Sequence, residues 1–556
     1  MVKKNRVRII AGLFFFILLI LSINAYAQAP GWQWAYQAGG SDSDQANRIY
    51  VDGDNNCYVT GKFRGTTHFG SYTLTSNGWD DVFIAKLDSD GNWAWAKSAG
   101  SGPGTSADIG NGITGDASGN IYVTGQFKGN VDFGSFPLFS NGEYDVFVAK
   151  LDPDGNWLWA RSAGGPMGDA GRGIAVDDDS NVYVTGEFWD TVTFGTHSIT
   201  SSGLNDVFVA KLNQNGHWQW AEGAGGSTSE TGGRGVAVDA AGNCYVTGMF
   251  SNTATFGTHS ISSNGWRADI FIAKLNADRI WQWASGAGST ETDYVENITL
   301  DGSGNPYVVG SFKSTALFGY SYLTSLGDYD IFVAKLDQTG NWQWASQAGG
   351  VQKDYGYDIS TDIAGNSYIT GYFKDTAYFG AGSITSSGSY DVCVAKLGDD
   401  GTWLWAADAG GTGWCEGHGI GLDNDENCCV TGFFQGTAYF GTNSVVSSGS
   451  NDIFVAKIGD NVSSDPEIGY DIYAISHYPN PVRTITTIQY SMKEAALVKL
   501  EVYNIKGQLV ETLFDENIQA GDHTVEWDCQ DMPSGMYFLK MKAGDEESVR
   551  KMVLMR

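Results

Sequence analysis

A pair of tryptophans followed by alanine, Trp-x-Trp-Ala, recurs at nearly constant spacing along most of the chain. Its copies lie 61, 64, 61, 63, 61 and 61 residues apart, starting at Trp32, Trp93, Trp157, Trp218, Trp281, Trp342 and Trp403. An apolar run similar to DVFVAKL recurs with it, starting at Asp81, Asp145, Asp206, Asp269, Asp330, Asp391 and Asp452. Self-similarity at a fixed period indicates one structural unit per repeat, stacked on its neighbours to bury a continuous core.

Each repeat contains four short segments with the composition of strands. In the first unit they are residues 48–52, 57–63, 81–87 and 93–99. Tight turns rich in Asp, Asn and Gly join the first strand to the second and the third to the fourth, because these residues tolerate positive φ and bond to the local backbone. A longer loop joins the second strand to the third. Four strands in each of seven units, with no helical period, predict an all-β fold, a seven-bladed β-propeller.

The strands are apolar on both faces, as expected for sheets that stack face to face. The paired tryptophans should bury a large area between blades, worth roughly 1.5–3 kcal/mol for each side chain. A glycine recurs in every second strand, where we expect a neighbouring blade to approach the backbone closely. Its copies are Gly61, Gly125, Gly186, Gly248, Gly310, Gly371 and Gly432.

The order of the strands predicts how the propeller closes. The chain enters with a tryptophan-pair strand at Trp32, before any first, second or third strand. It leaves the repeats after a third-type strand, residues 452–458, which no tryptophan pair follows. We therefore expect the Trp32 strand to complete the last blade, which removes the exposed edges of an open array.

The repeat unit resembles the β-propeller repeat family of exported bacterial proteins known as SBBP repeats. The resemblance lies in patterns such as VDDDSNVYVTGEF at 176–188 and DVFVAKLDPDGNWLWA at 145–160. It extends over all seven units and implies the fold. It implies no particular reaction, because the family is defined by its repeat.

The N-terminus predicts export. Residues 1–27 have a basic start, an apolar stretch and a small-x-small cleavage site at Ala25-Tyr26-Ala27, as in a secretory signal peptide. The apolar stretch is shorter than the ~20 residues of a membrane-spanning helix. We therefore expect cleavage after Ala27, a propeller over residues 28–458, and no transmembrane segment in the mature chain.

The C-terminus predicts a destination. A linker at residues 459–474 precedes a different all-β pattern at 475–556, in which alternating apolar and polar residues suggest a small immunoglobulin-like β-sandwich. This segment resembles the C-terminal sorting domain of the type IX secretion system. The matching positions include Tyr478, Pro479, Asn480, Pro481, Gly507, Gly535, Tyr537 and Lys551. The resemblance implies recognition by that machinery and transport to the surface of a Gram-negative cell or beyond it.

The net charge of the chain limits the classes of ligand that it is expected to bind. The formal net charge of −30 should repel phosphate backbones, so nucleic acid is not an expected ligand, whereas glycans, proteins and cations are compatible with it.

Seven cysteines, an odd number, argue against a disulfide framework. A pair between Cys415 and either Cys428 or Cys429 is left open.

Candidate binding residues are the tryptophans outside the repeated pairs. Trp79, Trp189, Trp266 and Trp414 fall in the connecting loops, where aromatic side chains on a rigid scaffold are typical of binding surfaces. Their alternative role is to cover the blade tops. The Asp-x-Asp-Gly-Asn turns have oxygen ligands at calcium-like spacing but lack the distal Glu of an EF-hand loop, so they are also explained as hydrogen-bonded turns. Catalytic motifs are not found.

These observations favour a secreted or surface-attached binding or adhesion module with a glycan or protein ligand. One alternative is an extracellular polysaccharide hydrolase or lyase that works in a central funnel. Another is a calcium-stabilised structural surface protein.

Overall fold

The structure is a computed structural model that describes residues 27–102, 107–459, 475–478, 482, 484–492, 496–506, 508–519, 521–530, 532–543 and 546–554. The chain divides into two compact units, Met1–Asn461 and Val462–Arg556. Apart from Ala27 and Gly459, the predicted signal peptide and linker lie outside the described residues. Within the described ranges no segment is helical, and so none is a helix that could span a membrane.

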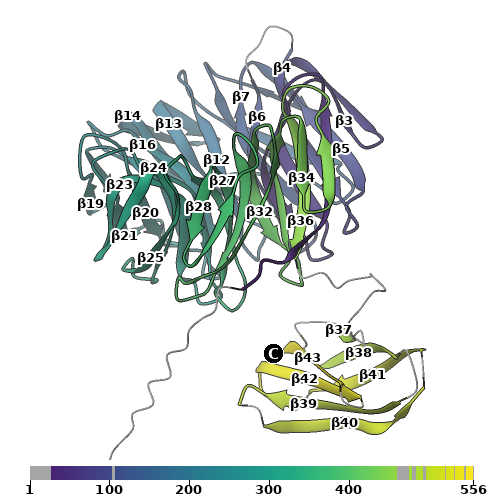
Figure 1. Cartoon of the computed structure of the whole chain (residues 1–556). Coiled ribbons are helices and arrows are strands. Elements are labelled where there is room, and N and C mark those ends of the chain that lie inside the picture. The colour runs from purple at the N-terminus through teal and green to yellow at the C-terminus, as the bar shows by residue number, and fades with distance from the viewer. Residues whose placement is uncertain are drawn as a thin grey trace, which may run out of the picture. The chain divides into compact units, whose positions relative to one another are not determined.

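The first unit is a succession of four-stranded antiparallel sheets (Figure 1). In the first of them, β2 (Gln45–Val51), β3 (Cys57–Phe69), β4 (Tyr72–Leu87) and β5 (Trp93–Ala99) pair in chain order. The same order recurs in β6 (Ile109–Gly115), β7 (Ile121–Phe127), β10 (Asp145–Leu151) and β11 (Trp157–Ala163); β12 (Ala170–Val176), β13 (Val182–Phe194), β14 (His197–Leu212) and β15 (Trp218–Ala224); β16 (Thr231–Val238), β17 (Cys244–Phe250), β20 (Asp269–Leu275) and β21 (Trp281–Ala287); β22 (Tyr294–Leu300), β23 (Pro306–Phe318), β24 (Ser321–Leu336) and β25 (Trp342–Gly349); and β26 (Tyr355–Thr361), β27 (Ser367–Phe373), β30 (Asp391–Leu397) and β31 (Trp403–Gly411).

The last sheet of this unit joins the two ends of the repeat region. Three of its strands are β32 (Cys415–Leu422), β33 (Cys428–Phe434) and β36 (Asp452–Gly459). Its fourth strand is β1 (Gly31–Gly40), which pairs antiparallel with β36. The Trp32 ring meets the Phe440 ring edge to face, with 5.1 Å between centroids. The sheet that contains the end of the repeats therefore also contains their start.

The connection between second and third strands is a β-hairpin, where the sequence analysis expected a loop. In three sheets the long strands themselves extend into it, as β3 and β4 do. Elsewhere it consists of separate short strands: β8 (Asn130–Phe133) with β9 (Phe136–Phe139), β18 (Thr253–Phe256) with β19 (His259–Ser262), β28 (Thr376–Phe379) with β29 (Gly382–Thr385), and β34 (Thr437–Phe440) with β35 (Asn443–Val446). Each hairpin also touches the fourth strand of the preceding sheet, as in the pairing of β28 with β25 and of β34 with β31. The hairpins thus tie neighbouring sheets together.

The recurring second-strand glycine sits opposite a β-bulge. In one sheet Gly110 pairs with Gly125 and Gly112 pairs with Thr124, which leaves Asn111 without a partner. A Cβ added to Gly125 would lie 1.9 Å from the carbonyl oxygen of Ile109. The expected close approach exists, but the expected neighbour was wrong. It is the first strand of the same sheet, because the bulge pushes that carbonyl out of the regular ladder.

This geometry predicts that Gly248→Ala is strongly destabilising. The new Cβ would lie 2.0 Å from the Gly232 carbonyl oxygen, so backbone must move, and we expect a loss of roughly 2–4 kcal/mol in unfolding free energy. Gly286→Ala in the same sheet is the matched control, because its Cβ would meet nothing nearer than the Phe250 ring at 3.4 Å. Denaturant unfolding measures both variants. Equal losses would contradict the argument.

The second unit consists of two sheets around one core. β37 (Ile475–Tyr478), β38 (Ile485–Met492) and β41 (Gly521–Asp528) form one, and β40 (Leu509–Ile518), β39 (Ala496–Asn504), β42 (Gly535–Ala543) and β43 (Glu546–Leu554) form the other. Trp527 and Tyr537 meet in the core at 5.5 Å between ring centroids, and the Tyr537 hydroxyl donates to the Pro533 carbonyl at 2.8 Å. Of the predicted sorting positions, Tyr478 ends β37, Gly535 starts β42 and Lys551 lies in β43. Pro479, Asn480, Pro481 and Gly507 lie outside the described residues.

Candidate functional site

One position of the repeat has the same backbone arrangement in every copy but carries different side chains. It is the bulged residue of each first strand, which the strand registers leave unpaired: Asn47, Asn111, Arg172, Arg234, Glu296, Tyr357 and His418. All of these residues line a single cavity of about 400 Å³, the bulge cavity. Because a bulge re-aims its side chain, the repeated backbone directs a set of different chemical groups into one space.

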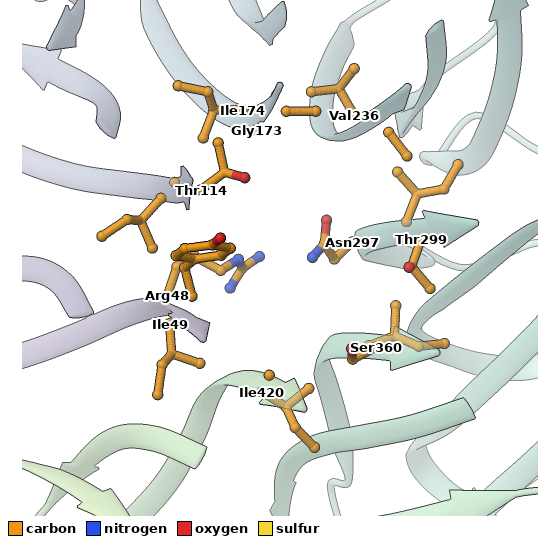
Figure 2. A pocket seen from close by; sticks show the side chains of 18 of the residues that line it. Arg48, Ile49, Thr114, Gly173, Ile174, Val236, Asn297, Thr299, Ser360 and Ile420 are labelled. Carbon is orange, nitrogen blue, oxygen red and sulfur yellow. The ribbon is translucent and has the colours of Figure 1, made fainter. Parts of the chain in front are cut away.

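A second cavity, of about 530 Å³, is lined by the same first strands beyond the bulges. Arg48, Arg172 and Arg234 line both cavities. Figure 2 shows the side chains of Arg48 and Asn297 pointing into the second one, among a rim of aliphatic residues. The Arg48 guanidinium donates to the carbonyl oxygens of His418 at 2.8 Å and Glu296 at 3.2 Å. These bonds hold its positive charge between the two cavities.

Tyr294, Tyr357 and His418 give the bulge cavity an aromatic side, and further rings pack behind them. Tyr355 stacks on Tyr372 at 5.1 Å between centroids, Tyr357 lies 5.8 Å from Tyr372, and His418 lies 4.5 Å from Tyr357. The contacts continue through Tyr294, Phe433, Trp414 and Tyr390. Burial is the main cause that raises the pKa of Tyr357 and of Tyr372, so both phenols stay neutral. We call this set the aromatic wall.

Another side of the cavity is charged. Glu187, on the second strand β13, accepts Arg172 at 2.6 Å and lies 3.8 Å from an Arg234 nitrogen. Burial favours the neutral acid, but the two guanidinium groups outweigh it and hold the pKa of Glu187 below its usual value. Glu187 is therefore a carboxylate that fixes both arginines. The bulged asparagines have a different role, since Asn47 and Asn111 donate to the carbonyl oxygens of Gly110 and Gly171 in the following sheets.

A hydrogen-bond chain fixes the orientation of His418. Its Nε2 lies 2.8 Å from Glu416 Oε2, and its Nδ1 lies 3.1 Å from the Gln45 side-chain nitrogen. The Trp414 indole donates to the other Glu416 oxygen at 2.7 Å. Both ring nitrogens of His418 are therefore engaged by neighbouring side chains. The chain positions a flat ring against the cavity and leaves no free nitrogen as a general base.

The predicted tryptophans separate into two pairs. Trp189 lines a further cavity with Glu187 and Arg234, and Trp414 belongs to the aromatic wall. Trp79 and Trp266 are 60% and 74% exposed, and each lies beside an arginine, Arg64 or Arg267. The sequence analysis missed the bulged residues. Aligning the internal copies would have singled them out, because that first-strand position holds five different residue types in seven copies.

The carboxylates of the acidic turns accept hydrogen bonds from their own turn and from the strand that follows it. Asp52 Oδ1 accepts the backbone N–H groups of Asp54 and Asn56, each at 2.9 Å, and Oδ2 accepts the Tyr58 hydroxyl at 3.0 Å. Asp177 and Asp116 have the same arrangement. Among the described residues no group of three His, Cys, Asp or Glu could hold a metal. Calcium binding stays a prediction.

The open cysteine pairing does not fit the strand register. In the β32–β33 pair, Cys415 lies opposite Phe434, whereas Cys428 lies opposite Leu422 at the other end of the strands. Six residues of strand separate the two ends, about 20 Å at ~3.3 Å per residue. Cys429, opposite Gly421, is nearly as distant. Cys415 therefore cannot reach either neighbour.

Comparison with known proteins assigns both parts of the chain. Residues 476–555 match the model of the secretion system C-terminal sorting domain, and residues 158–187 and 343–372 match the β-propeller repeat. The uncharacterized WD repeat-containing protein L264 of Acanthamoeba polyphaga mimivirus is 22% identical over 537 residues, covering 78% of this chain and 38% of that protein. The regulatory protein FlaEY of Caulobacter vibrioides is 26% identical over 385 residues, covering 64% of this chain and 39% of that protein. The chain thus spans about two fifths of the length of these relatives.

Among solved structures, one similar chain is PorZ, a bacterial surface component of the type IX secretion system of Porphyromonas gingivalis. It is 14% identical, with a TM-score of 0.37, and the match covers 93% of this chain and 60% of PorZ. The sorting domain implies interaction with the type IX secretion machinery. The chain is therefore a β-propeller repeat protein with a type IX sorting domain, exported to the cell surface or the extracellular space.

Proposed function

We propose that the exported protein is a seven-bladed propeller, closed by β1, that binds a glycan in its bulge cavity, and that the C-terminal unit is an immunoglobulin-like sandwich. The pairing of β1 with β36 supports the closed ring. One observation carries the binding function: equivalent bulges of the first strands bring non-equivalent side chains into one cavity. A purely structural position would be expected to repeat along with its backbone.

The chemistry of the cavity suits a sugar. Aromatic faces such as those of Tyr294 and Tyr357, which line the cavity, pack against the apolar face of a pyranose ring, while a few fixed polar groups set its orientation. The guanidinium groups of Arg172 and Arg234 are already held by Glu187, so little side-chain freedom is lost when they donate to hydroxyl or carboxylate oxygens.

The lining favours binding over hydrolysis. Glycoside hydrolysis generally uses two carboxyl groups that flank the scissile bond at about 5–10 Å from each other. Of the residues that line the bulge cavity, only Glu296 carries a carboxylate, and Glu416 is occupied by Trp414 and His418. A calcium-stabilised surface role is tested separately, by melting the protein with and without a chelator.

Glycan binding is tested with the full chain on a glycan array, followed by fluorescence titration with the strongest ligand. Tyr357→Ala and Arg234→Ala are each expected to weaken binding by at least about tenfold, which corresponds to ~1.4 kcal/mol. Trp79→Ala and Trp266→Ala are matched controls and should leave affinity unchanged, because both side chains face solvent. Binding lost only in these controls would move the site to the loop tryptophans. A folded protein that retains no glycan would overturn the proposal.

A further inference from the structure

The second residue of each second strand is a tyrosine, with one exception. The tyrosines are Tyr58, Tyr122, Tyr183, Tyr245, Tyr307 and Tyr368, and the exception is Cys429 in β33. Each tyrosine packs into the core of the next sheet, and four of them share that buried cluster with the first residue of its second strand. Tyr183 thus shares a buried cluster with Cys244, and Tyr368 shares one with Cys428.

The Cys429 side chain also packs into the core of the next sheet, and there it lies near Cys57. It lies in the core of the β2–β5 sheet with Cys57, Val59 and Phe83, and both cysteines are almost completely buried. Both are free thiols, and the neighbouring Cys429 is the largest cause that raises the pKa of Cys57, ahead of burial. Since β33 belongs to the last sheet of the repeats and β3 to the first, the two thiols face each other where the start and end of the repeat region meet. We call this contact the seam.

The exchange of tyrosine for cysteine removes interactions that the other contacts have. In the β12–β15 sheet the Lys211 ammonium donates to the Tyr183 hydroxyl at 2.5 Å and lies 3.4 Å from Asp177. At the seam no tyrosine hydroxyl is present, and the Lys457 ammonium lies 2.5 Å from the Asp423 carboxylate. The seam therefore lacks the large aromatic ring and the phenol bond, and Cys57 has a second thiol near it where Cys244 and Cys428 have a tyrosine.

We propose that Cys57 and Cys429 form a disulfide bond in the exported protein, which covalently joins the first and last sheets of the repeat region. The oxidant is an exported thiol–disulfide oxidoreductase. The thiolate of one cysteine attacks the disulfide of that enzyme to give a mixed disulfide, and the thiolate of the other cysteine then displaces the enzyme. Two electrons pass to the enzyme, and the two thiol protons reach it directly or through solvent. The enzyme therefore leaves as the dithiol.

The location and environment agree with this chemistry. Export takes the chain into compartments where disulfides form and persist. Burial raises the pKa of Cys244 and Cys393, and it also contributes to the raised pKa of Cys57. What distinguishes Cys57 and Cys429 is that they share one buried cluster, whereas Cys244 and Cys393 each lie in a cluster with no other cysteine. Because Cys57 and Cys429 are buried in the folded unit, the exchange takes place before the seam closes. A bond between residues so distant in sequence restricts the unfolded chain strongly.

The test uses full-length protein collected after export without reductant, denatured in an alkylating reagent and mapped by mass spectrometry. We expect a cross-linked pair of peptides that contain Cys57 and Cys429, no alkylation of these two before reduction, and full alkylation of Cys244 and Cys393. Reduction should lower the melting temperature by several degrees. Alkylation of Cys57 and Cys429 without reduction, in exported protein, would overturn the proposal.

Two variants separate the bond from the packing. Cys429→Tyr recreates at the seam the tyrosine–cysteine contact of Tyr183 with Cys244, so it should fold and should lose the response of its melting temperature to reductant. Cys244→Ser alters the same strand position away from the seam and should keep that response. Equal responses to reductant in wild type and Cys429→Tyr would contradict the disulfide. If Cys429→Tyr does not fold, peptide mapping of the wild-type protein decides the question alone.

Discussion

Removal of β1 is expected to abolish the single cooperative unfolding transition of the repeat region and to make the protein self-associate. The strand contributes the partly buried Trp32 and Trp34, the buried Ala38 and a ladder of hydrogen bonds to β36. Together these are worth on the order of 5–10 kcal/mol. Without β1, β36 becomes an open edge with unpaired N–H and C=O groups, which is a template for another chain.

Calorimetry and size-exclusion chromatography of a variant that lacks residues 27–40 test this expectation. Removal of residues 462–556 is the control, because these form the other compact unit and should leave the main transition in place. A synthetic peptide of residues 27–40, added in excess, should restore the transition by occupying the vacant edge. An unchanged melting temperature and a monomeric state in the β1 deletion would show that the last sheet is stable with three strands.

The stability of the repeat region is expected to fall as the pH rises from about 5 to about 8. In each sheet of the repeat region, the apolar run of the third strand begins with a buried aspartate whose Oδ1 has no hydrogen-bond partner: Asp81, Asp145, Asp206, Asp269, Asp330, Asp391 and Asp452. Burial raises the pKa of Asp145 and Asp330 to about 7, and that of Asp81 to about 6. Asp169 lies near Asp145, and its own pKa is also about 6, so like charge adds to the effect.

The sign follows from linkage. The folded-state pKa of these carboxyls lies above the ordinary value of 3.8, so the folded protein holds protons that the unfolded chain releases. Their contribution to stability is complete below about pH 4 and is lost as the pH rises through 6 to 7. Turn aspartates such as Asp116 and Asp177 have lowered pKa values, and the stability that they add is lost only at more acidic pH.

Melting curves from about pH 5 to about pH 8 test this, with Asp145→Asn as the diagnostic variant. An asparagine oxygen can still accept the Asn141 N–H, which is 3.0 Å from Asp145 Oδ2, but the side chain no longer ionises. We expect it to stabilise the protein at pH 8 by on the order of 1–3 kcal/mol and to have little effect at pH 5. A wild-type melting temperature that increases with pH over this range would contradict the assignment.

The sequence predicted the strands whose signal recurs in every copy. Residues 145–151 and 93–99 form β10 and β5 with the expected bounds, because apolar runs and tight turns coincide there. The hairpins between second and third strands were missed. Arms as short as Asn130–Phe133 carry too little alternation to be recognised, and they depend on the neighbouring sheet for part of their pairing.

The candidate site was predictable only in part. Trp189 and Trp414 were singled out because aromatic residues between repeated strands are conspicuous in a sequence, and their role in binding stays a prediction. The bulge that aims Arg234 or Tyr357 inward is a shift of one residue in register, which no local pattern reveals. A pair of Cys415 with Cys428 or Cys429 was left open from the sequence, whereas Cys57, which lies in the same buried cluster as Cys429, is brought there by the arrangement of the sheets.

The pairing of β1 with β36 also imposes an order on folding. Gly31 faces Gly459, so the opening strand cannot dock until the whole intervening chain has been made and arranged. Contacts between such distant residues form slowly, and a chain that waits for them is prone to aggregate. A cell that produces this protein must therefore shield the incomplete last sheet during synthesis and transport, and β1, which precedes the other described strands in the chain, is among the last to find its partner.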